Sequence, residues 1–391
     1  MLVFLLAISF SCNTGTGSVS GLSVDSLNQA RAAMKALVDN GELPCVATLV
    51  MKDGVIVRQF AYGMADREEE RALAGDAIYR IYSMSKPITA AALMILYDEG
   101  KFRLDDPVAE YIPAFEDTKV YADGELVDQQ EPFTVRHLLT HTAGFTYGWE
   151  EGSHVDSLYG QLRSDAGWNT GTLEEMINLV AAIPLKYQPG TTYEYSISID
   201  VAGYLVEVLS GTTFDQFLRE RLFDPLEMDD TGFEVPEEDF DRLAMIYTRD
   251  KDSVELTPVP ERTNGVKQKV TFFSGGGGMV STLSDYSRFG QMLLNGGELN
   301  GVRVLQESTV KLIMSDQMPE AVDYDGGYGL GGYVNLDDGS YGWSGATSTD
   351  FVANPSRNMV ILSFTQYVPF MGVPFADQYK QMVWNALLDN I

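Results

Sequence analysis

Strand-like runs at both ends of the chain constrain the fold more than any other feature of this sequence. Near the N-terminus, two β-rich runs at 45–52 and 55–62 are separated by Asp53-Gly54, a dipeptide typical of a tight hairpin. Near the C-terminus, four more runs read as strands, with Gly, Asp and Asn between them: 328–335, 341–346, 349–354 and 358–365. Because helical patterns dominate between the two groups, we expect one antiparallel sheet built from both ends of the chain.

Helical patterns complete this expected architecture. A helix with apolar residues from Leu27 onward stops at Gly41, and a final helix covers 375–389. We therefore expect an α+β fold in which an antiparallel sheet domain flanked by helices, formed by 24–105 and 266–391, carries an inserted helical lobe at 106–265. A cleft between two such lobes is where a substrate site is expected.

The charge of the chain excludes some partners. Its 391 residues contain 27 Lys and Arg against 56 Asp and Glu, a formal net charge of −29. Nucleic-acid binding needs clustered cations to neutralise phosphates, so we expect no nucleic-acid partner. An anionic membrane surface is disfavoured for the same reason.

Cysteine and histidine are too scarce for a disulfide framework or for most metal sites. The chain has two cysteines, Cys12 and Cys45, and three histidines, with neither a CxxC nor an HExxH motif. The segment Asp323-Tyr-Asp325 loosely suggests a calcium loop, but its remaining ligand positions are missing, which makes it a turn. We expect neither a metal nor a cofactor.

The first 23 residues have the character of a leader. Residues 1–10 are apolar but too short to span a bilayer, and they resemble the hydrophobic part of a signal peptide without its usual basic start. A Gly/Ser/Thr-rich stretch then runs to Ser23, which suits a flexible leader. We expect a secreted or periplasmic protein with no transmembrane segment. Cys12 is a candidate lipid anchor, which leaves a lipoprotein as the alternative to a cleaved leader.

Nucleophilic serine chemistry of the Ser-His-Asp type is not supported. No GxSxG motif occurs, and His137 and His141 are expected to support a helix end and a turn. A serine and a lysine spaced as S-x-x-K offer another way to activate a hydroxyl, and the chain has two such pairs. In the first pair, Ser308 and Lys311 stand at the start of an amphipathic helix, so Ser308 is interpreted as a helix cap.

The second pair, Ser83 and Lys86, has a different setting. Pro87 belongs in a first helical turn, so we expect a helix to begin within about a residue of Ser83. From Ile88 to Leu96 only Thr89 is polar, which predicts a helix buried on every side. Lys86 would enter that core with no carboxylate nearby in sequence, and burying an unpaired ammonium favours the neutral amine. The helix start would also stabilise an alkoxide at Ser83.

Two later segments add weaker signals. Tyr195 lies in a PGTTYEYS segment just before an apolar helix predicted at 200–209, where a tyrosine close to a lysine could act as a base. A Trp343-Ser344-Gly345 strand could let its backbone approach a bound carbonyl. Taken alone, each segment is more typical of ordinary packing.

Together these motifs resemble the serine β-lactamase and penicillin-binding-protein superfamily. SMSK before an apolar helix, KFRLDDPVAEYIPAF, RHLLTHTAGF, PGTTYEYS and the late WSGA strand follow one another in that order. The sequence is most similar to class C β-lactamases and family VIII carboxylesterases, from about residue 27 onward. That resemblance implies a class C β-lactamase-like fold with the site between sheet and lobe.

The resemblance also implies residue roles. Ser83 would be the nucleophile, Lys86 its partner and Tyr195 the tyrosine of the family's Tyr-x-Asn motif, so these three are the expected catalytic residues. The backbone N–H groups of Ser83 and Ala346 would form the oxyanion hole. The expected substrate-binding residues are Trp343, Ser344, Gly345 and Ile197. Two of these depart from β-lactamases, which carry Lys at the position of Trp343 and Asn at that of Ile197; family VIII esterases depart at the same places.

The expected function is therefore a serine hydrolase that cleaves short-chain carboxylic esters through an acyl-enzyme on Ser83, with weak β-lactam hydrolysis at most. A β-lactamase or a D-amino-acid peptidase of the same fold is the first alternative. A non-catalytic protein that binds penicillin or peptidoglycan is the second. The expected partner is a small-molecule ester.

Overall fold

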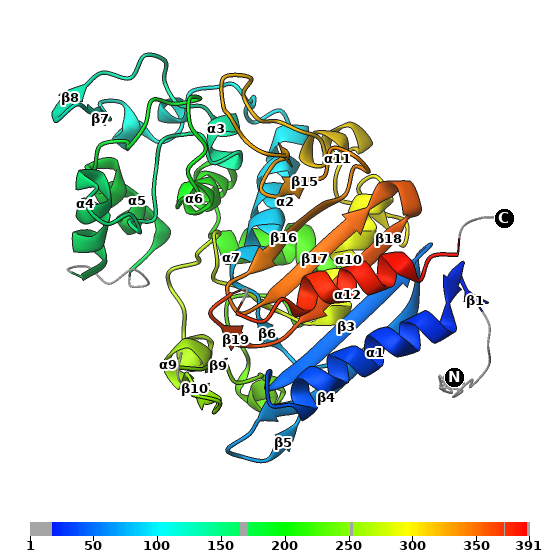
Figure 1. The fold of residues 1–391 in the computed structure, drawn as a ribbon. Helices are drawn as coiled ribbons and strands as arrows, with labels where there is room; N and C mark the ends of the chain where they lie inside the picture. The colour runs from blue at the N-terminus through cyan, green and yellow to red at the C-terminus, as the bar shows by residue number, and fades with distance from the viewer. Residues whose placement is uncertain (1–17, 165–170, 251–252, 371, 389–391) are drawn as a thin grey trace, which may run out of the picture.

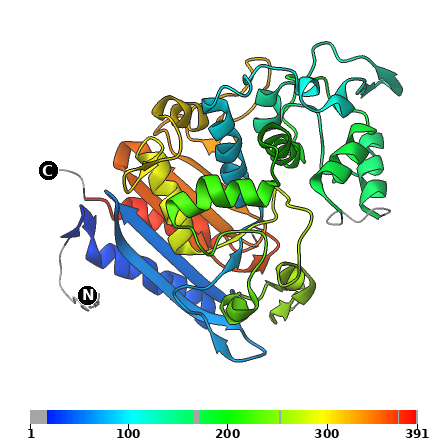
Figure 2. The same ribbon diagram turned by 180° about the vertical axis from the view of Figure 1, so that it is seen from behind.

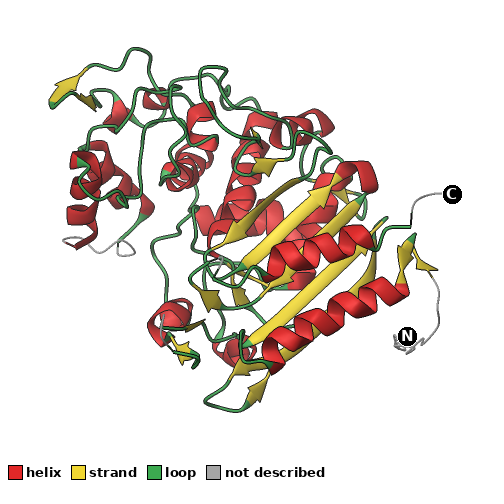
Figure 3. Ribbon diagram, viewed as in Figure 1, coloured by secondary structure: helices red, strands yellow, loops and turns green. Residues whose placement is uncertain are grey.

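An eight-stranded antiparallel sheet forms the centre of the molecule. The computed structural model describes residues 18–164, 171–250, 253–370 and 372–388. The strand order in the sheet is β14-β15-β16-β17-β18-β3-β4-β5, and Figure 3 shows its strands in yellow. Its strands are β3 (Cys45–Lys52), β4 (Val55–Asp66), β5 (Arg71–Ala72), β14 (Gly327–Tyr328), β15 (Tyr333–Val334), β16 (Tyr341–Gly345), β17 (Thr349–Asn354) and β18 (Met359–Phe364).

Strands from the two ends of the chain meet at the middle of this sheet. β3 pairs with β18 in a register that sets Val50 opposite Ile361, and β3 continues through the Asp53-Gly54 turn into β4. The predicted α+β architecture, with one antiparallel sheet made from both termini, is confirmed. Shorter strands lie outside this sheet: β1 (Ser18–Val19), β2 (Leu22–Ser23), β6 (Tyr79–Arg80), β7 (Val120–Ala122), β8 (Glu125–Val127), β9 (Tyr247–Thr248), β10 (Thr257–Pro258), β11 (Val280–Ser281), β12 (Glu298–Leu299), β13 (Val302–Arg303) and β19 (Tyr367–Val368).

Helices cover both faces of the sheet. α1 (Val24–Asp39) and α12 (Phe375–Asn385) lie together on one face, in front of the strands in Figure 1. α10 (Leu283–Leu294) packs on the other face, which Figure 2 shows from behind. Side chains of β3 alternate accordingly: Val50 joins the core beneath α1 and α12, whereas Leu49 joins the core on the opposite side. Both faces of the central strands are therefore buried.

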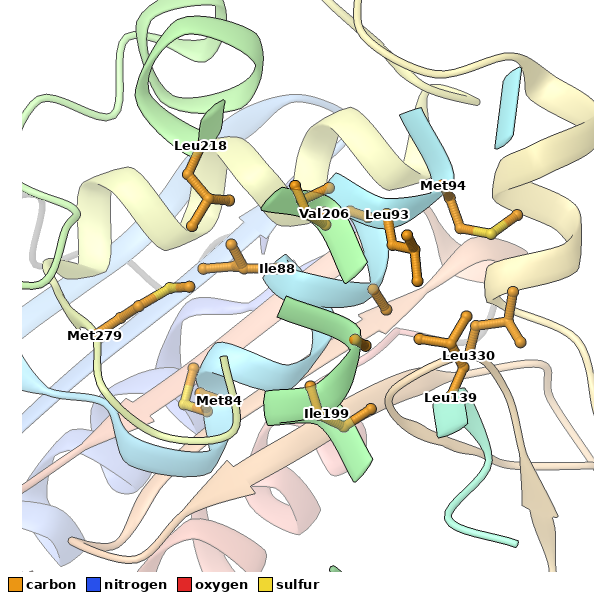
Figure 4. Packing of buried hydrophobic residues seen from close by; sticks show 14 of the residues in the cluster. Met84, Ile88, Leu93, Met94, Leu139, Ile199, Val206, Leu218, Met279 and Leu330 are labelled. Carbon is orange, nitrogen blue, oxygen red and sulfur yellow. The ribbon is translucent and has the colours of Figure 1, made fainter. Parts of the chain in front are cut away.

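The second of these cores extends into a lobe of helices. α2 (Ser85–Asp98) is buried from Ser85 to Leu96, as its apolar sequence predicts, and it packs against α6 (Ser198–Ser210). Figure 4 shows Ile88 and Leu93 of α2 beside Val206 of α6 in this core. The lobe's other helices are α3 (Val135–Leu139), α4 (His154–Leu162), α5 (Leu173–Ala181) and α7 (Phe214–Leu218). Three further short helices are α8 (Asp224–Leu226), α9 (Pro260–Thr263) and α11 (Glu307–Ile313).

Three expectations about chain segments need correction. The run 328–335 is not one strand but two, β14 and β15, because the chain turns between them where Gly331 (φ +76°) passes over α2; a Cβ there would lie 2.7 Å from Ala90 Cβ. The last helix ends at Asn385 instead of 389. Residues 18–23 are not a flexible leader, since they form the β1–β2 hairpin and bury Leu22 against the core of α1 and α12.

The expected leader and lipid anchor concern the first residues of the chain. Residues 1–17, including the candidate lipid anchor Cys12, lie outside the described residues, so the leader and the anchor stay predictions. Within residues 18–164, 171–250, 253–370 and 372–388, no helix is both long and apolar enough to cross a bilayer.

Candidate active site

Ser83 and Lys86 meet where the chain enters the buried helix α2. Ser83 lies in a single 3₁₀ turn, η1 (Tyr82–Met84), so the α-helix itself begins two residues later than the serine. Tyr82 has φ 43°, an uncommon conformation for a tyrosine, which turns the chain sharply just before Ser83. Lys86 is fully buried, and its Nζ donates to Ser83 Oγ at 3.2 Å and to the Gly276 carbonyl at 2.6 Å.

A second element, the loop at 274–278, fixes that carbonyl. Asp200, in the first turn of α6, accepts hydrogen bonds from Ser274 Oγ at 2.6 Å and from the Gly276 N–H at 3.1 Å. Burial raises the pKa of the Asp200 carboxyl, against the lowering effects of these hydrogen bonds and of the Lys86 charge. No carboxylate is close to Lys86 in the sequence, as expected, but the fold brings Asp200 of α6 close enough to interact with its charge.

Tyr195 lies directly over the lysine. The Lys86 Nζ is 4.5 Å from the centre of the Tyr195 ring, and 5.4 Å from that of Tyr147. The indole Nε1 of Trp343, on β16, donates to the Tyr195 hydroxyl at 3.3 Å. An indole N–H is a donor only, so the Tyr195 oxygen accepts this bond and keeps its own proton for donation elsewhere.

His141 packs against Tyr195. Its ring is 4.8 Å from that of Tyr195, and its Nδ1 accepts the backbone N–H of Ser196 at 3.2 Å. Burial, and then the Lys86 charge, hold the pKa of His141 well below its usual value. The imidazole is therefore neutral, and it acts as a packing and hydrogen-bonding group beside the site. His137, in contrast, completes the capping box at the start of α3, the helix-end role expected for it.

The turn after β16 lies against the chain segment that leads to Ser83. A Cβ on Gly345 would be 2.2 Å from the Ile81 carbonyl oxygen, so only glycine allows this approach. Thr347 Oγ1 donates to the Arg80 carbonyl at 2.8 Å and fixes the turn in that place. The Ala346 N–H, between these two contacts, has no acceptor among the residues that the structure describes.

Three sequence assignments change in the structure. Ile197 is only 1% exposed and packs in the main core, which corrects the substrate-binding role expected for it. Ser344 Oγ donates to Asp350 at 2.7 Å, on the strand face opposite to Trp343, so only its backbone could reach a substrate. Ser308 is the second residue of α11 and not its cap, which is Gln306; its partner Lys311 is exposed and pairs with Glu307.

Several residues of the site were missed from the sequence. Tyr147, His141, Asp200 and Gly276 all surround Lys86 or Tyr195; the first two come from the segment between α3 and α4, and the others from α6 and the loop at 274–278. Two sequence signals could have found Gly276 and Asp200. The first is the glycine run at 275–278, and the second is a lone carboxylate in the first turn of an otherwise apolar helix.

Comparisons with known proteins agree with this fold. The family model described as Beta-lactamase matches residues 30–381. Protein Rv1367c of Mycobacterium tuberculosis is 30% identical over 380 residues, which is 90% of this chain and 92% of that protein. Esterase EstB of Burkholderia gladioli is 33% identical over 258 residues, 61% of this chain and 63% of EstB. The solved structure of EstCE1, a hydrolase with promiscuous acyltransferase activity, has a TM-score of 0.78 at 25% identity and covers 93% of this chain and 99% of its own.

Proposed function

Since this chain belongs to the beta-lactamase family and is a serine hydrolase of that fold, we propose that it cleaves short-chain carboxylic esters through an acyl-enzyme on Ser83. The observation that carries the proposal is the contact of Lys86 Nζ with Ser83 Oγ, beneath a tyrosine whose hydroxyl is held by an indole. The similarity to an esterase and to a structurally characterised hydrolase supports the same class of reaction.

The proposed reaction moves a proton from Ser83 to the Lys86 and Tyr195 pair, and from that pair to the leaving alcohol. In the proposed reaction Lys86 keeps an N–H on the Gly276 carbonyl, and the Lys86 and Tyr195 pair accepts the proton of Ser83. The Ser83 Oγ bonds to the ester carbonyl carbon, and the N–H groups of Ser83 and Ala346 would stabilise the oxyanion, each by about 3 kcal/mol. The ester C–O bond then breaks as Tyr195 returns the proton to the alcohol. A water molecule then attacks the acyl-enzyme with the same proton transfers, which frees Ser83 and releases the acid.

The surroundings of Tyr195 favour esters over β-lactams. A β-lactam carries a carboxylate, for which a cation or a free donor at close range is the usual partner. Trp343 offers a single N–H, and the Tyr195 hydroxyl already accepts it. The loss of a charged contact costs about 2–3 kcal/mol, or roughly two orders of magnitude in kcat/KM. A β-lactamase or D-amino-acid peptidase is therefore the less favoured reaction for this pocket.

Initial rates test this assignment. We expect p-nitrophenyl acetate and butyrate to be hydrolysed with a kcat/KM about a hundredfold above that for a chromogenic cephalosporin. Ser83→Ala should abolish nearly all of this activity while the circular dichroism spectrum is unchanged. Ser308→Ala, the matched change in the other S-x-x-K pair, should leave the rate within about a factor of two. Equal kcat/KM for the cephalosporin and the butyrate would contradict the esterase assignment.

Covalent labelling separates an enzyme from a receptor. A fluorescent phosphonate should label the wild-type protein at Ser83, located by mass spectrometry, and should not label Ser83→Ala. A protein that only binds penicillin-like ligands without an activated serine would remain unlabelled in both forms.

A further inference from the structure

Trp149 exposes a large apolar ring at the edge of the candidate active site. Its side chain is 64% exposed, although indole is among the most hydrophobic side chains. It stacks on Tyr147, with ring centres 4.7 Å apart and planes 21° from parallel, and it lies 6.1 Å from the Tyr195 ring. The three rings pack on one another, so that the cluster extends from Lys86, which faces Tyr147 and Tyr195, to the exposed Trp149.

A buried cation holds this surface in place. Lys186, whose side chain is only 8% exposed, forms ion pairs with Glu150 at 2.6 Å and with Glu194 at 3.0 Å. Glu150 follows Trp149 in the sequence, and Glu194 precedes Tyr195, so one ammonium ties together the neighbours of both rings. A third pair, with Asp156 of α4 at 3.0 Å, anchors the cluster in the lobe.

A third contact joins the same segments. Thr146 Oγ1 donates to Asp156 at 2.7 Å and reaches Glu194 at 3.2 Å, and it also accepts the Gly148 N–H at 3.1 Å. The backbone on both sides of Tyr147 is therefore fixed before any ligand arrives. An exposed ring on an ordered backbone, close to the proposed nucleophile, costs little entropy to use as a binding surface.

We propose that Trp149 is a stacking platform for a flat, aromatic or conjugated group of the substrate ester, and that Lys186 is the positioning residue for it. The inference rests on the proposed esterase function and specifies its substrate class. The flat group could belong to the acyl part or to the alcohol part of the ester, because both extend from the same carbonyl carbon. Stacking on an indole discriminates flat rings from puckered ones of similar size.

Matched ester pairs test the platform. Phenyl and cyclohexyl butyrate differ in the alcohol, and ethyl benzoate and ethyl cyclohexanecarboxylate differ in the acyl group; the release of acid is followed in a pH-stat. In one of the two pairs, Trp149→Leu should lower kcat/KM for the aromatic ester about fivefold to tenfold, mainly through KM, and should change the cyclohexyl ester less than about twofold. Trp149→Phe keeps a flat ring, so its kcat/KM for the aromatic ester should lie between the values for Trp149→Leu and the wild type.

Two further variants make the result specific. Leu126→Ala removes another exposed apolar side chain of the same lobe, on β8, and should leave all four rates unchanged. Lys186→Met should reproduce the selective loss of the aromatic ester, as a positioning role requires. Equal losses for aromatic and cyclohexyl esters in Trp149→Leu, or no loss at all, would overturn the platform.

Binding without turnover separates this inference from the esterase assignment. N-phenylbutyramide and N-cyclohexylbutyramide, together with benzamide and cyclohexanecarboxamide, are titrated calorimetrically into Ser83→Ala protein with and without Trp149→Leu. A preference for one phenyl compound that disappears in the double variant supports the platform even if no ester is hydrolysed. Ester hydrolysis by the wild type with no such preference would sustain the proposed function and refute the platform.

Discussion

At the scale of single residues, Lys86 and Tyr195 share one task in the proposed reaction. Lys86 Nζ is 3.2 Å from Ser83 Oγ and faces the Tyr195 ring at 4.5 Å, and both side chains would handle the same serine proton. Groups that act as a unit do not contribute independently to a rate, because removal of either one already breaks the proton path.

We therefore expect Lys86→Ala and Tyr195→Phe each to lower kcat for p-nitrophenyl butyrate by about two to four orders of magnitude. The double variant should be little slower than the slower single variant. Stopped or continuous assays of all four proteins measure this, with thermal unfolding to show that each is folded. Multiplicative losses in the double variant would mean that one of the two side chains only supports the fold.

How far the site could be predicted depends on the distance along the chain. Ser83 and Lys86 are three residues apart, so their proximity follows from helical geometry alone. The contact of Lys86 with the Gly276 carbonyl spans 190 residues, and no local pattern predicts it. The likeness to a known superfamily indicated Tyr195 and Trp343, but it could not show that Ile197 is buried, because burial is set by packing that a motif does not contain.

At the scale of elements, the contact between α10 and the sheet is closely packed. A Cβ on Gly290 of α10 would lie 2.9 Å from a ring carbon of Phe351 and 3.0 Å from Val360 on the two central strands. Such an overlap forces neighbouring atoms to move, which costs about 1–3 kcal/mol in a well-packed core. Gly160 in α4 is the opposite case, because nothing described lies within 4 Å of an added Cβ.

Opposite effects on stability should follow from the same substitution at these two glycines. Gly290→Ala should lower the free energy of unfolding by about 1–3 kcal/mol, whereas Gly160→Ala should raise it by about 0.5–1 kcal/mol through helix propensity. Urea denaturation followed by circular dichroism compares both with the wild type. Stabilisation by alanine at both positions would show that α10 can move away from the sheet at no cost.

Elements themselves were easier to predict than their breaks. The β3–β4 hairpin and the largely buried α2 follow from alternation, turn residues and apolar content, all of which are local. The division of 328–335 into β14 and β15 was missed because the cause is external: the chain bends where it crosses α2 at Lys86 and Ala90. Where a neighbour from elsewhere in the fold shapes a segment, the only local sign in its sequence is the glycine that permits the turn, here Gly331.

At the scale of the whole molecule, the acidic excess and the buried carboxyls together determine how stability depends on pH. The net charge of −29 opposes compactness near neutral pH, and this repulsion decreases as carboxylates are protonated. Burial raises the pKa of Asp285, in the first turn of α10, to about 6. Asp156 behaves oppositely: although burial works against it, hydrogen bonds from Ser153, Thr146 and Lys186 lower its pKa to about 2.

The signs of these two shifts predict a maximum of stability near pH 4. An unfolded Asp has a pKa of about 3.9, so the folded protein holds a proton at Asp285 that the unfolded chain has released, and the contribution of Asp285 falls as pH rises through 6. Asp156 contributes stability above about pH 4 that is lost as pH falls toward 2.

Asp285→Asn can still accept hydrogen bonds from Thr231 and the Asp230 N–H, but it no longer titrates. Between pH 5 and 8, urea denaturation should therefore show a loss of unfolding free energy that is about 1 kcal/mol smaller in Asp285→Asn than in the wild type. Identical pH profiles for the two proteins would show that the Asp285 carboxyl is ionised in the folded state throughout this range.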